Sequence, residues 1–201
     1  MPGTVAASPV LADRILDAAL ALVGRWGVAK TSLGDIAREA GCGRATLYRV
    51  FPQGKAHLFH SLGQRELARF FDRLSTRLDR AASLEDALVA AINESASFVR
   101  GHEGLQFILA HEPGLVLPYL GFTQVDRLYR AAALLAGPHL VRFLDVERTP
   151  WAVEWLVRVV VSYLFIPAEG TDLTSDADTR RLVQTYLLPA LTASHSIDSR
   201  S

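Results

Sequence analysis

Residues 32–59 constrain the fold of this chain more than any other stretch of its sequence. Four apolar residues recur there at the spacing of one helix face: Leu33, Ile36, Ala37 and Ala40. Thr31 or Ser32 supplies a side-chain oxygen that can cap the start of this helix. Gly41 follows its end, and glycine readily adopts the left-handed conformation that lets a chain reverse. The pattern therefore predicts a short helix followed by a tight turn.

A second short helix is predicted for residues 44–50, with the sequence RATLYRV. Phe51-Pro52 ends it, because a proline disfavours helical backbone at the residue before it. Only Leu47, Val50 and Phe51 can be buried in so short a helix, so the other side chains must face outward. These are Arg44, Ala45, Thr46, Tyr48 and Arg49, preceded by Gly43. Arginines, a hydroxyl and a phenol, with small residues that permit close approach, suit phosphates and base edges in a DNA major groove.

The segment from Ile15 to Leu58 resembles the DNA-binding domain of the TetR family of bacterial transcriptional regulators. The resemblance rests on a first helix ILDAALALVGRWGV, a second helix TSLGDIA, a recognition helix AGCGRATLYRVF and a lysine that begins the fourth helix. It implies base-facing positions for Arg44, Ala45 and Tyr48. It implies positions nearer the DNA backbone for Ser32, Thr46, Arg49 and Lys55. The insertion PQGK places Lys55 one residue later than the commoner family spacing.

Charge is unevenly distributed along the chain, although the formal net charge is zero. Residues 1–60 contain seven Lys or Arg and four Asp or Glu, whereas residues 61–201 contain fourteen and seventeen. The basic excess therefore coincides with the predicted DNA-binding motif. The single cysteine, Cys42, cannot form an internal disulfide. In a turn it is either a small packing residue or a redox switch beside DNA.

The periodicity of the chain predicts an all-α protein with an N-terminal three-helix helix-turn-helix domain and a larger C-terminal helical domain. The resemblance to the TetR family implies that the larger domain serves ligand binding and dimerisation. The expected limits of these domains are residues 1–54 and 55–201. Helices are predicted over residues 13–26, 55–81, 83–101, 105–110, 115–135, 151–166 and 176–191. Gly137-Pro138 is expected to interrupt the helical continuation beyond residue 135. The side chains expected to be buried within these helices include Trp26 and Leu67, and Tyr186 is among the apolar residues that the last helix offers to the dimer interface.

Two predicted helices, Trp151–Ile166 and Asp176–Leu191, are expected to form a homodimer interface. The first is apolar almost all round, so it must be covered on both sides. A second subunit would supply the second cover, and two helices from each chain would then make a four-helix interface. Such a dimer would place two recognition helices in successive major grooves, roughly 34–36 Å apart, on a near-palindromic double-stranded DNA operator.

The C-terminal domain is expected to bind a small, largely apolar effector. Aromatic and polar residues there could line an apolar pocket with a few orienting groups. The candidate residues are Phe98, Phe107, His111, Tyr119, Phe122, Tyr129, Trp155, Arg158 and Ser162. Plain core packing remains the alternative for the aromatic ones. Arg158 either forms a salt bridge with Glu154, one turn earlier, or meets a ligand carboxylate.

We expect a cytoplasmic protein without a membrane segment, a metal site or a cofactor, and not an enzyme. The most apolar late stretch, Ala152 to Pro167, carries charged residues and is shorter than the roughly 20 residues of a membrane span. Neither His102-Glu103 nor His111-Glu112 continues to the second histidine of a zinc protease motif.

Three functional hypotheses remain open at this point. The first is a ligand-responsive dimeric transcriptional regulator, a repressor that leaves its operator when the effector binds. The second is an all-α enzyme that uses the histidine and carboxylate groups of residues 102–130. The third is a DNA-binding dimer without an effector, whose larger domain serves only for assembly.

Overall fold

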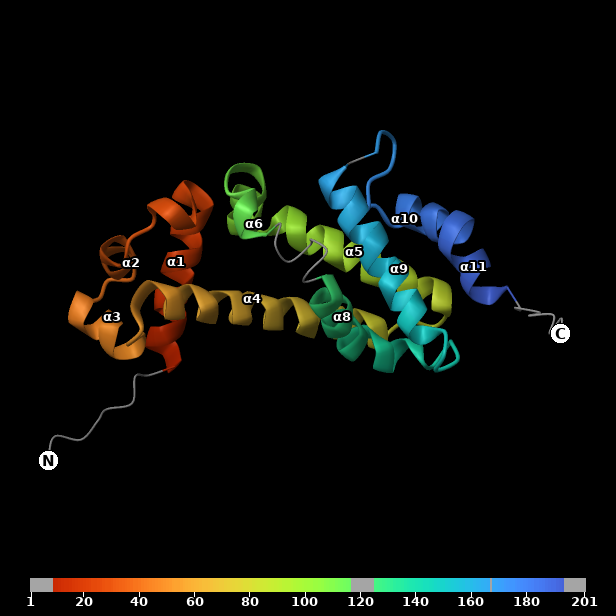
Figure 1. Cartoon of the computed structure of the whole chain (residues 1–201), viewed down its shortest axis with the longest axis horizontal. Coiled ribbons are helices and arrows are strands. Elements are labelled where there is room, and N and C mark those ends of the chain that lie inside the picture. The colour runs from red at the N-terminus through yellow and green to blue at the C-terminus, as the bar shows by residue number, and fades with distance from the viewer. Residues whose placement is uncertain (1–8, 117–124, 167, 194–201) are drawn as a thin grey trace, which may run out of the picture. The chain divides into compact units, whose positions relative to one another are not determined.

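The computed structural model describes residues 9–116, 125–166 and 168–193, and within these ranges the chain is helical and contains no β-strand. The all-α prediction is therefore confirmed (Figure 1). The elements are α1 (Pro9–Lys30), α2 (Leu33–Glu39), α3 (Arg44–Val50), α4 (Gly54–Asp79), α5 (Leu84–Gly101), α6 (Glu103–His111), the 3-10 helix η1 (Pro113–Leu115), α8 (Val125–Leu140), α9 (Thr149–Phe165), α10 (Asp176–Leu182), the π-helical turn η2 (Val183–Leu187) and α11 (Leu188–Thr192).

The chain forms two compact units, and α4 and α5 each contribute residues to both. The first unit comprises residues 1–69 and 99–120, and the second comprises residues 70–98 and 121–201. The predicted functional boundary between residues 54 and 55 stays a prediction. Among the described residues, no helix has both the length and the hydropathy that a membrane span requires.

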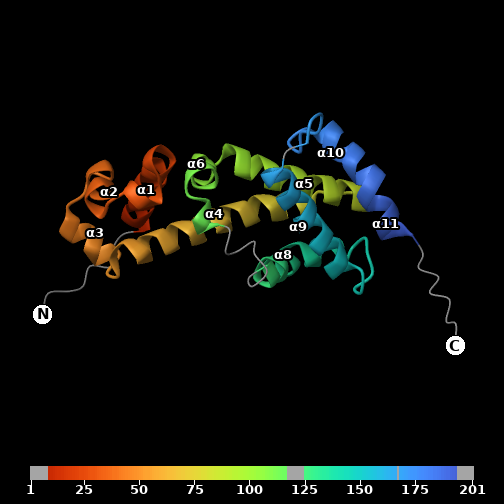
Figure 2. The same ribbon diagram turned by 45° about the horizontal axis from the view of Figure 1, so that its top comes forward.

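The first unit is built around one apolar cluster that joins α1, α2, α3 and the first part of α4. The cluster contains Ile15, Leu16, Ala18, Ala19, Leu22, Ile36, Ala37, Ala40, Leu47, Phe51, Leu58 and Leu62. Helix α6 also lies against α1 within this unit (Figure 2). A two-helix motif alone is too small to bury a core, so α1 and α4 supply the surface against which α2 and α3 pack.

The second unit has its own core, formed by the last part of α4 together with α5, α8, α9 and the C-terminal helices. Asn93 on α5 is a buried polar residue in this core. Its amide donates to the carbonyl oxygen of Leu173 at 2.6 Å and to the hydroxyl oxygen of Thr179 at 2.8 Å. These bonds fix the loop before α10 onto α5, because a buried amide left without partners would be costly.

Two expected details of the core, the burial of Leu67 and of Trp26, are wrong. Leu67 is exposed because the buried face of α4 that begins at Leu58 continues through Arg65 and Glu66, whose side chains are each 13% exposed. Tyr186 is 70% exposed on the π-helical turn η2, so it stays a candidate for the predicted dimer interface. Trp26 is also exposed, and the Arg25 guanidinium lies over its ring.

The predicted helical break at Gly137-Pro138 is also wrong, because α8 continues through Pro138 to Leu140. Pro138 lies in the last turn of α8, so its missing N–H removes a hydrogen bond only at the end of the helix. The predicted helix over residues 115–135 falls partly outside the described residues. Within the described part, η1 ends at Leu115 and α8 begins at Val125.

Candidate nucleic-acid interface

The turn between α2 and α3 is fixed by a capped helix start and a left-handed glycine. The Ser32 hydroxyl accepts the backbone N–H of Asp35 at 3.2 Å and donates to the Asp35 carboxylate at 2.5 Å. This hydrogen bond lowers the pKa of the Asp35 carboxyl, and Arg38 lowers it further. Gly41 has φ of 59°, as a reversal at that position requires. The sequence-predicted cap and turn are both present.

Helix α3 is attached to the core by Leu47 and Val50 and by Phe51 directly after it, and its other side chains are directed mainly to solvent. Leu47 is fully buried and Phe51, directly after the helix, is almost fully buried. The outward side chains of Arg44, Ala45, Tyr48 and Arg49 are exposed, while Thr46 is partly buried. Tyr48 is a large aromatic residue that remains 50% exposed. This face can therefore reach a surface outside the protein without any change in the core.

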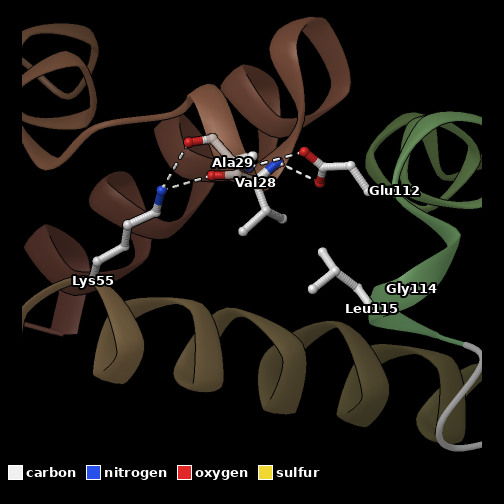
Figure 3. A pocket seen from close by; sticks show the side chains of 6 residues that line it. All are labelled: Val28, Ala29, Lys55, Glu112, Gly114 and Leu115. Atoms are coloured by element: carbon white, nitrogen blue, oxygen red, sulfur yellow. Dashed lines mark hydrogen bonds between the residues drawn. The ribbon is translucent and has the colours of Figure 1, made fainter.

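Two of the predicted DNA-binding side chains already have partners within the protein. The Ser32 hydroxyl is the cap of α2. The Lys55 ammonium donates to the backbone carbonyl oxygens of Val28, at 2.7 Å, and Ala29, at 3.3 Å (Figure 3). A cation bound by two carbonyl groups is less available to a phosphate, so we leave Lys55 out of the proposed interface. Gly43 lies exposed just before α3 in extended conformation.

A cluster that the sequence analysis missed surrounds the C-terminal end of α1. Helical geometry is interrupted at Gly27, which has φ of 80°. The Glu112 carboxylate, just after α6, accepts the backbone N–H groups of Val28 and Ala29, both at 2.9 Å (Figure 3). Together with Lys55, it satisfies the four backbone polar groups of these two residues. The glycine was the visible signal for the break, but nothing in the sequence indicated its distant partners.

A shallow cleft of about 320 Å³ lies beside this cluster (Figure 3). Its lining residues are Val28, Ala29, Lys55, Glu112, Gly114 and Leu115. The volume is at the lower end of the range for small-molecule sites. Both charged groups on its wall are already bonded to α1, so the free surface is mainly that of small apolar side chains. None of the predicted effector-binding residues lines this cleft.

The predicted effector-binding residues are divided between the two units. Phe107 and His111 belong to the first unit, where their rings stack with centroids 4.3 Å apart. Phe98 and the residues of α8 and α9 belong to the second, and Trp155, Arg158 and Ser162 lie on an exposed side of α9. Tyr119 and Phe122 lie outside the described residues. A pocket lined by this set stays a prediction.

Arg158 forms a salt bridge with Glu154, which is one of the two roles that the sequence predicts for it. Its guanidinium donates to the Glu154 carboxylate at 2.5 Å and lies over the ring of Tyr129, at 5.4 Å from the centroid. The hydrogen bond to Glu154 raises the pKa of Arg158. Because an arginine is charged at any ordinary pH, the salt bridge orients the side chain and does not set its protonation state.

A serine, a histidine and an aspartate line up where α8 meets the end of α4. The Ser75 hydroxyl oxygen lies 3.1 Å from Nε2 of His139, and Nδ1 of His139 lies 2.9 Å from the Asp79 carboxylate. The order is that of a hydrolytic triad, in which a buried aspartate orients the histidine. Asp79 is 64% exposed, however, and Arg142 donates to its backbone carbonyl. We interpret these contacts as a joint between the two helices.

Two of the groups considered for an enzyme, His102 and Glu112, have structural partners. His102 caps α6, because its Nδ1 accepts the backbone N–H of Leu105 at 2.9 Å. Glu112 accepts the backbone N–H groups of Val28 and Ala29, as described above. Within the part of the chain that the structure describes, no group of three metal-ligating side chains comes together.

Comparison with known proteins agrees with this geometry. A family model described as bacterial regulatory proteins, tetR family, matches residues 15–62. An uncharacterised HTH-type transcriptional regulator of Mycobacterium tuberculosis is 30% identical over 183 residues, which cover 90% of this chain and 85% of that protein. The fold is similar to that of the fatty acid degradation regulator FadR from Bacillus halodurans, with a TM-score of 0.61, 22% identity and coverage of 88% and 95% of the two chains. It is also similar to that of FadR from Bacillus subtilis in complex with stearoyl-CoA, with a TM-score of 0.59, 16% identity and coverage of 91% and 99%.

Alanine substitutions at Gly27 and Gly170 should separate backbone strain from crowding. Both glycines have φ near 80°, so alanine strains the backbone at each position. Only at Gly27 would the new Cβ approach Glu112 and Phe107, each at 2.6 Å, whereas nothing lies within 4 Å at Gly170. We expect Gly27→Ala to lower the free energy of unfolding by about 1–3 kcal/mol more than Gly170→Ala does. Urea unfolding of both variants measures this difference. Equal decreases in the free energy of unfolding would show that the Glu112 side chain moves away from the new methyl group without loss of stability.

Proposed function

Because the chain belongs to the TetR family of bacterial transcriptional regulators, we propose that it is a homodimer that binds a near-palindromic operator and leaves it when a small effector binds. The observation that carries the proposal is the outward face of α3. This face combines exposed arginine and tyrosine side chains with a firmly buried opposite side. Such a helix can enter a major groove while its core contacts hold it in place.

The exposed arginines of α3 favour DNA over a protein partner. Within the described residues, Arg44 and Arg49 form no hydrogen bond and no ion pair, so their N–H donors are free for phosphate or base edges. The basic excess of residues 1–60 would reinforce the attraction to a polyanion. In the proposed complex Arg44, Ala45 and Tyr48 face the bases, while Thr46 and Arg49 lie nearer the phosphates.

We propose that the dimer forms through α9 and the helices α10 and α11. Helix α9 buries Ala152, Val153 and Leu156 in the core of its own unit. Its other side exposes Trp151 and Trp155, whose rings meet edge to face with centroids 6.2 Å apart. Large exposed aromatic residues are typical of the buried centre of a protein interface.

We propose that the effector is an acyl-CoA and that the protein represses transcription in the absence of this effector. The support for this class comes from relatives, since FadR from Bacillus subtilis was solved with stearoyl-CoA. Such a ligand has a long apolar chain, which fits the expectation of a largely apolar effector. A cleft as small as the one beside Glu112 could hold only a fragment of it.

Selection of bound fragments from genomic DNA by the purified full-length protein tests this function. We expect enrichment of duplexes with two related half-sites whose centres are roughly one helical turn, or a multiple of it, apart. Repeating the selection with stearoyl-CoA should reduce recovery, whereas free coenzyme A should not. Absence of any enriched sequence would reject the DNA-binding function, and unchanged recovery with stearoyl-CoA would reject the acyl-CoA effector.

Arg49→Ala should reduce the salt dependence of operator binding. Loss of one phosphate contact lowers the slope of log affinity against log salt by about 0.9. Arg80→Ala is the matched control, because Arg80 is an exposed arginine that follows α4 in the second unit. Fluorescence anisotropy across a salt series measures both slopes. An unchanged slope for Arg49→Ala, or the same change for Arg80→Ala, would place the phosphate contact elsewhere.

Trp155→Glu should convert the proposed dimer to a monomer at micromolar concentration. A carboxylate at the centre of an apolar interface must be desolvated without a partner. Leu134→Glu is the control, because Leu134 on α8 is 79% exposed and lies outside the proposed interface. Sedimentation velocity of the three proteins gives the oligomeric state. If Trp155→Glu stays dimeric, α9 does not form the interface.

A further inference from the structure

Gly34 occupies a position on α2 where a larger residue would meet Arg44. A Cβ added at Gly34 would lie 3.0 Å from Cζ and 3.1 Å from Nε of Arg44, and closer still to one terminal nitrogen. No other neighbour is closer to that point. The Arg44 guanidinium therefore lies directly against the backbone of α2, in the space that a side chain at residue 34 would fill.

The occurrence of glycine here is not explained by the backbone of α2. Gly34 lies inside the helix, and its φ is not positive, unlike that of Gly27, Gly41, Gly54 and Gly170. A glycine in a helix lowers stability relative to alanine. The crowding is also cheap to relieve in the free protein, because the atoms involved are the far end of a flexible side chain. A larger residue at position 34 would therefore change the orientation of the Arg44 side chain, and it would not lower the stability of the fold.

Arg44 is the first residue of α3 and is exposed. A long side chain at such a position has many rotamers, and binding must restrict them. Contact with the α2 backbone limits this freedom in advance, which lowers the cost of binding. A guanidinium held in one orientation can form the paired hydrogen bonds that select guanine in a major groove.

We propose that Gly34 is a positioning residue for Arg44, and that its missing side chain sets the orientation in which Arg44 meets the operator. The inference rests on the proposed DNA-binding function. In this inference α2 contributes to sequence selectivity through the orientation of Arg44, and Gly34 itself does not contact DNA. Replacement of Gly34 should therefore weaken operator binding only when Arg44 is present.

A double-mutant cycle on the selected operator duplex tests this dependence with the full-length protein. The variants are Gly34→Ala, Arg44→Ala and their combination, with Gly63→Ala as the control. Gly63 is also a helical glycine, on α4, and a Cβ there would meet nothing within 4 Å. Affinity is measured by fluorescence anisotropy, and thermal unfolding checks that each variant folds. Double-mutant cycles isolate the coupling between two positions.

We expect Gly34→Ala to weaken operator binding about tenfold, and Arg44→Ala about 10- to 100-fold, the range for loss of a paired base contact. The double variant should bind no more weakly than Arg44→Ala, and Gly63→Ala should bind like the wild type. The melting temperature of Gly34→Ala should equal or exceed that of the wild type, because alanine favours helix.

Two outcomes would overturn the inference while leaving the DNA-binding function intact. Gly34→Ala could bind the operator as tightly as the wild type, or it could weaken binding equally in the Arg44→Ala background, which would mean that the added methyl group obstructs DNA directly. Failure of the wild-type protein to bind any duplex would instead reject the proposed function itself. The wild-type measurement therefore distinguishes the two failures.

Discussion

A helix of seven residues cannot be stable by itself, so α3 depends on contacts with the rest of its unit. Isolated helices in water need about 12–15 residues to be even marginally stable. Leu47 supplies the missing stability by complete burial between α3 and the rest of the first unit, and Phe51 closes the helix from its C-terminal end. Gly41, in a left-handed conformation, fixes the approach from α2. The outward face is therefore ordered although none of its own side chains contributes to the core.

The same unit depends on a second arrangement, in which side chains replace backbone hydrogen bonds. Where α1 is broken at Gly27, the backbone groups of Val28 and Ala29 lose their regular helical partners. Glu112 accepts both N–H groups and Lys55 donates to both carbonyl oxygens. Unpaired backbone groups would be costly at the part-buried Val28, so this cluster helps the chain to turn there. It also ties α1 to the start of α4 and to the end of α6.

Sequence reasoning succeeded where a local rule determines the structure. The limits of α3, the Ser32 cap and the turn at Gly41 all follow from spacing, capping and glycine within a few residues. It failed where the outcome depends on distant residues. Lys55 is one basic residue after a turn in the sequence, and only the fold reveals that Val28 and Ala29 are its partners.

Errors in burial had a related cause, because periodicity identifies an apolar stripe but not which neighbour covers it. Arg65 and Glu66 continue the covered face of α4, since they pair with each other and Arg65 also pairs with Asp17. A pattern search that treats charged residues as exposed selects Leu67 in their place. Around Tyr186 the helical period itself changes, because residues 183–187 form a π-helical turn that no pattern in the sequence indicates. The predicted effector residues were chosen by residue type alone, and a pocket lined by them stays a prediction.

The exposed side of α9 shows how polar and apolar groups divide one helix face. Glu154 and Arg158 pair across one turn, and Tyr129 lies under the guanidinium, so the charges there satisfy one another. An exposed pair of this kind contributes little stability, because water screens it and would solvate both groups equally well. Trp151 and Trp155 have no such compensation, and Trp155 remains 43% exposed in the single chain. Burial of these rings against a second subunit would release water from apolar surface, whereas the salt bridge could remain at the rim, which is the arrangement found in stable interfaces.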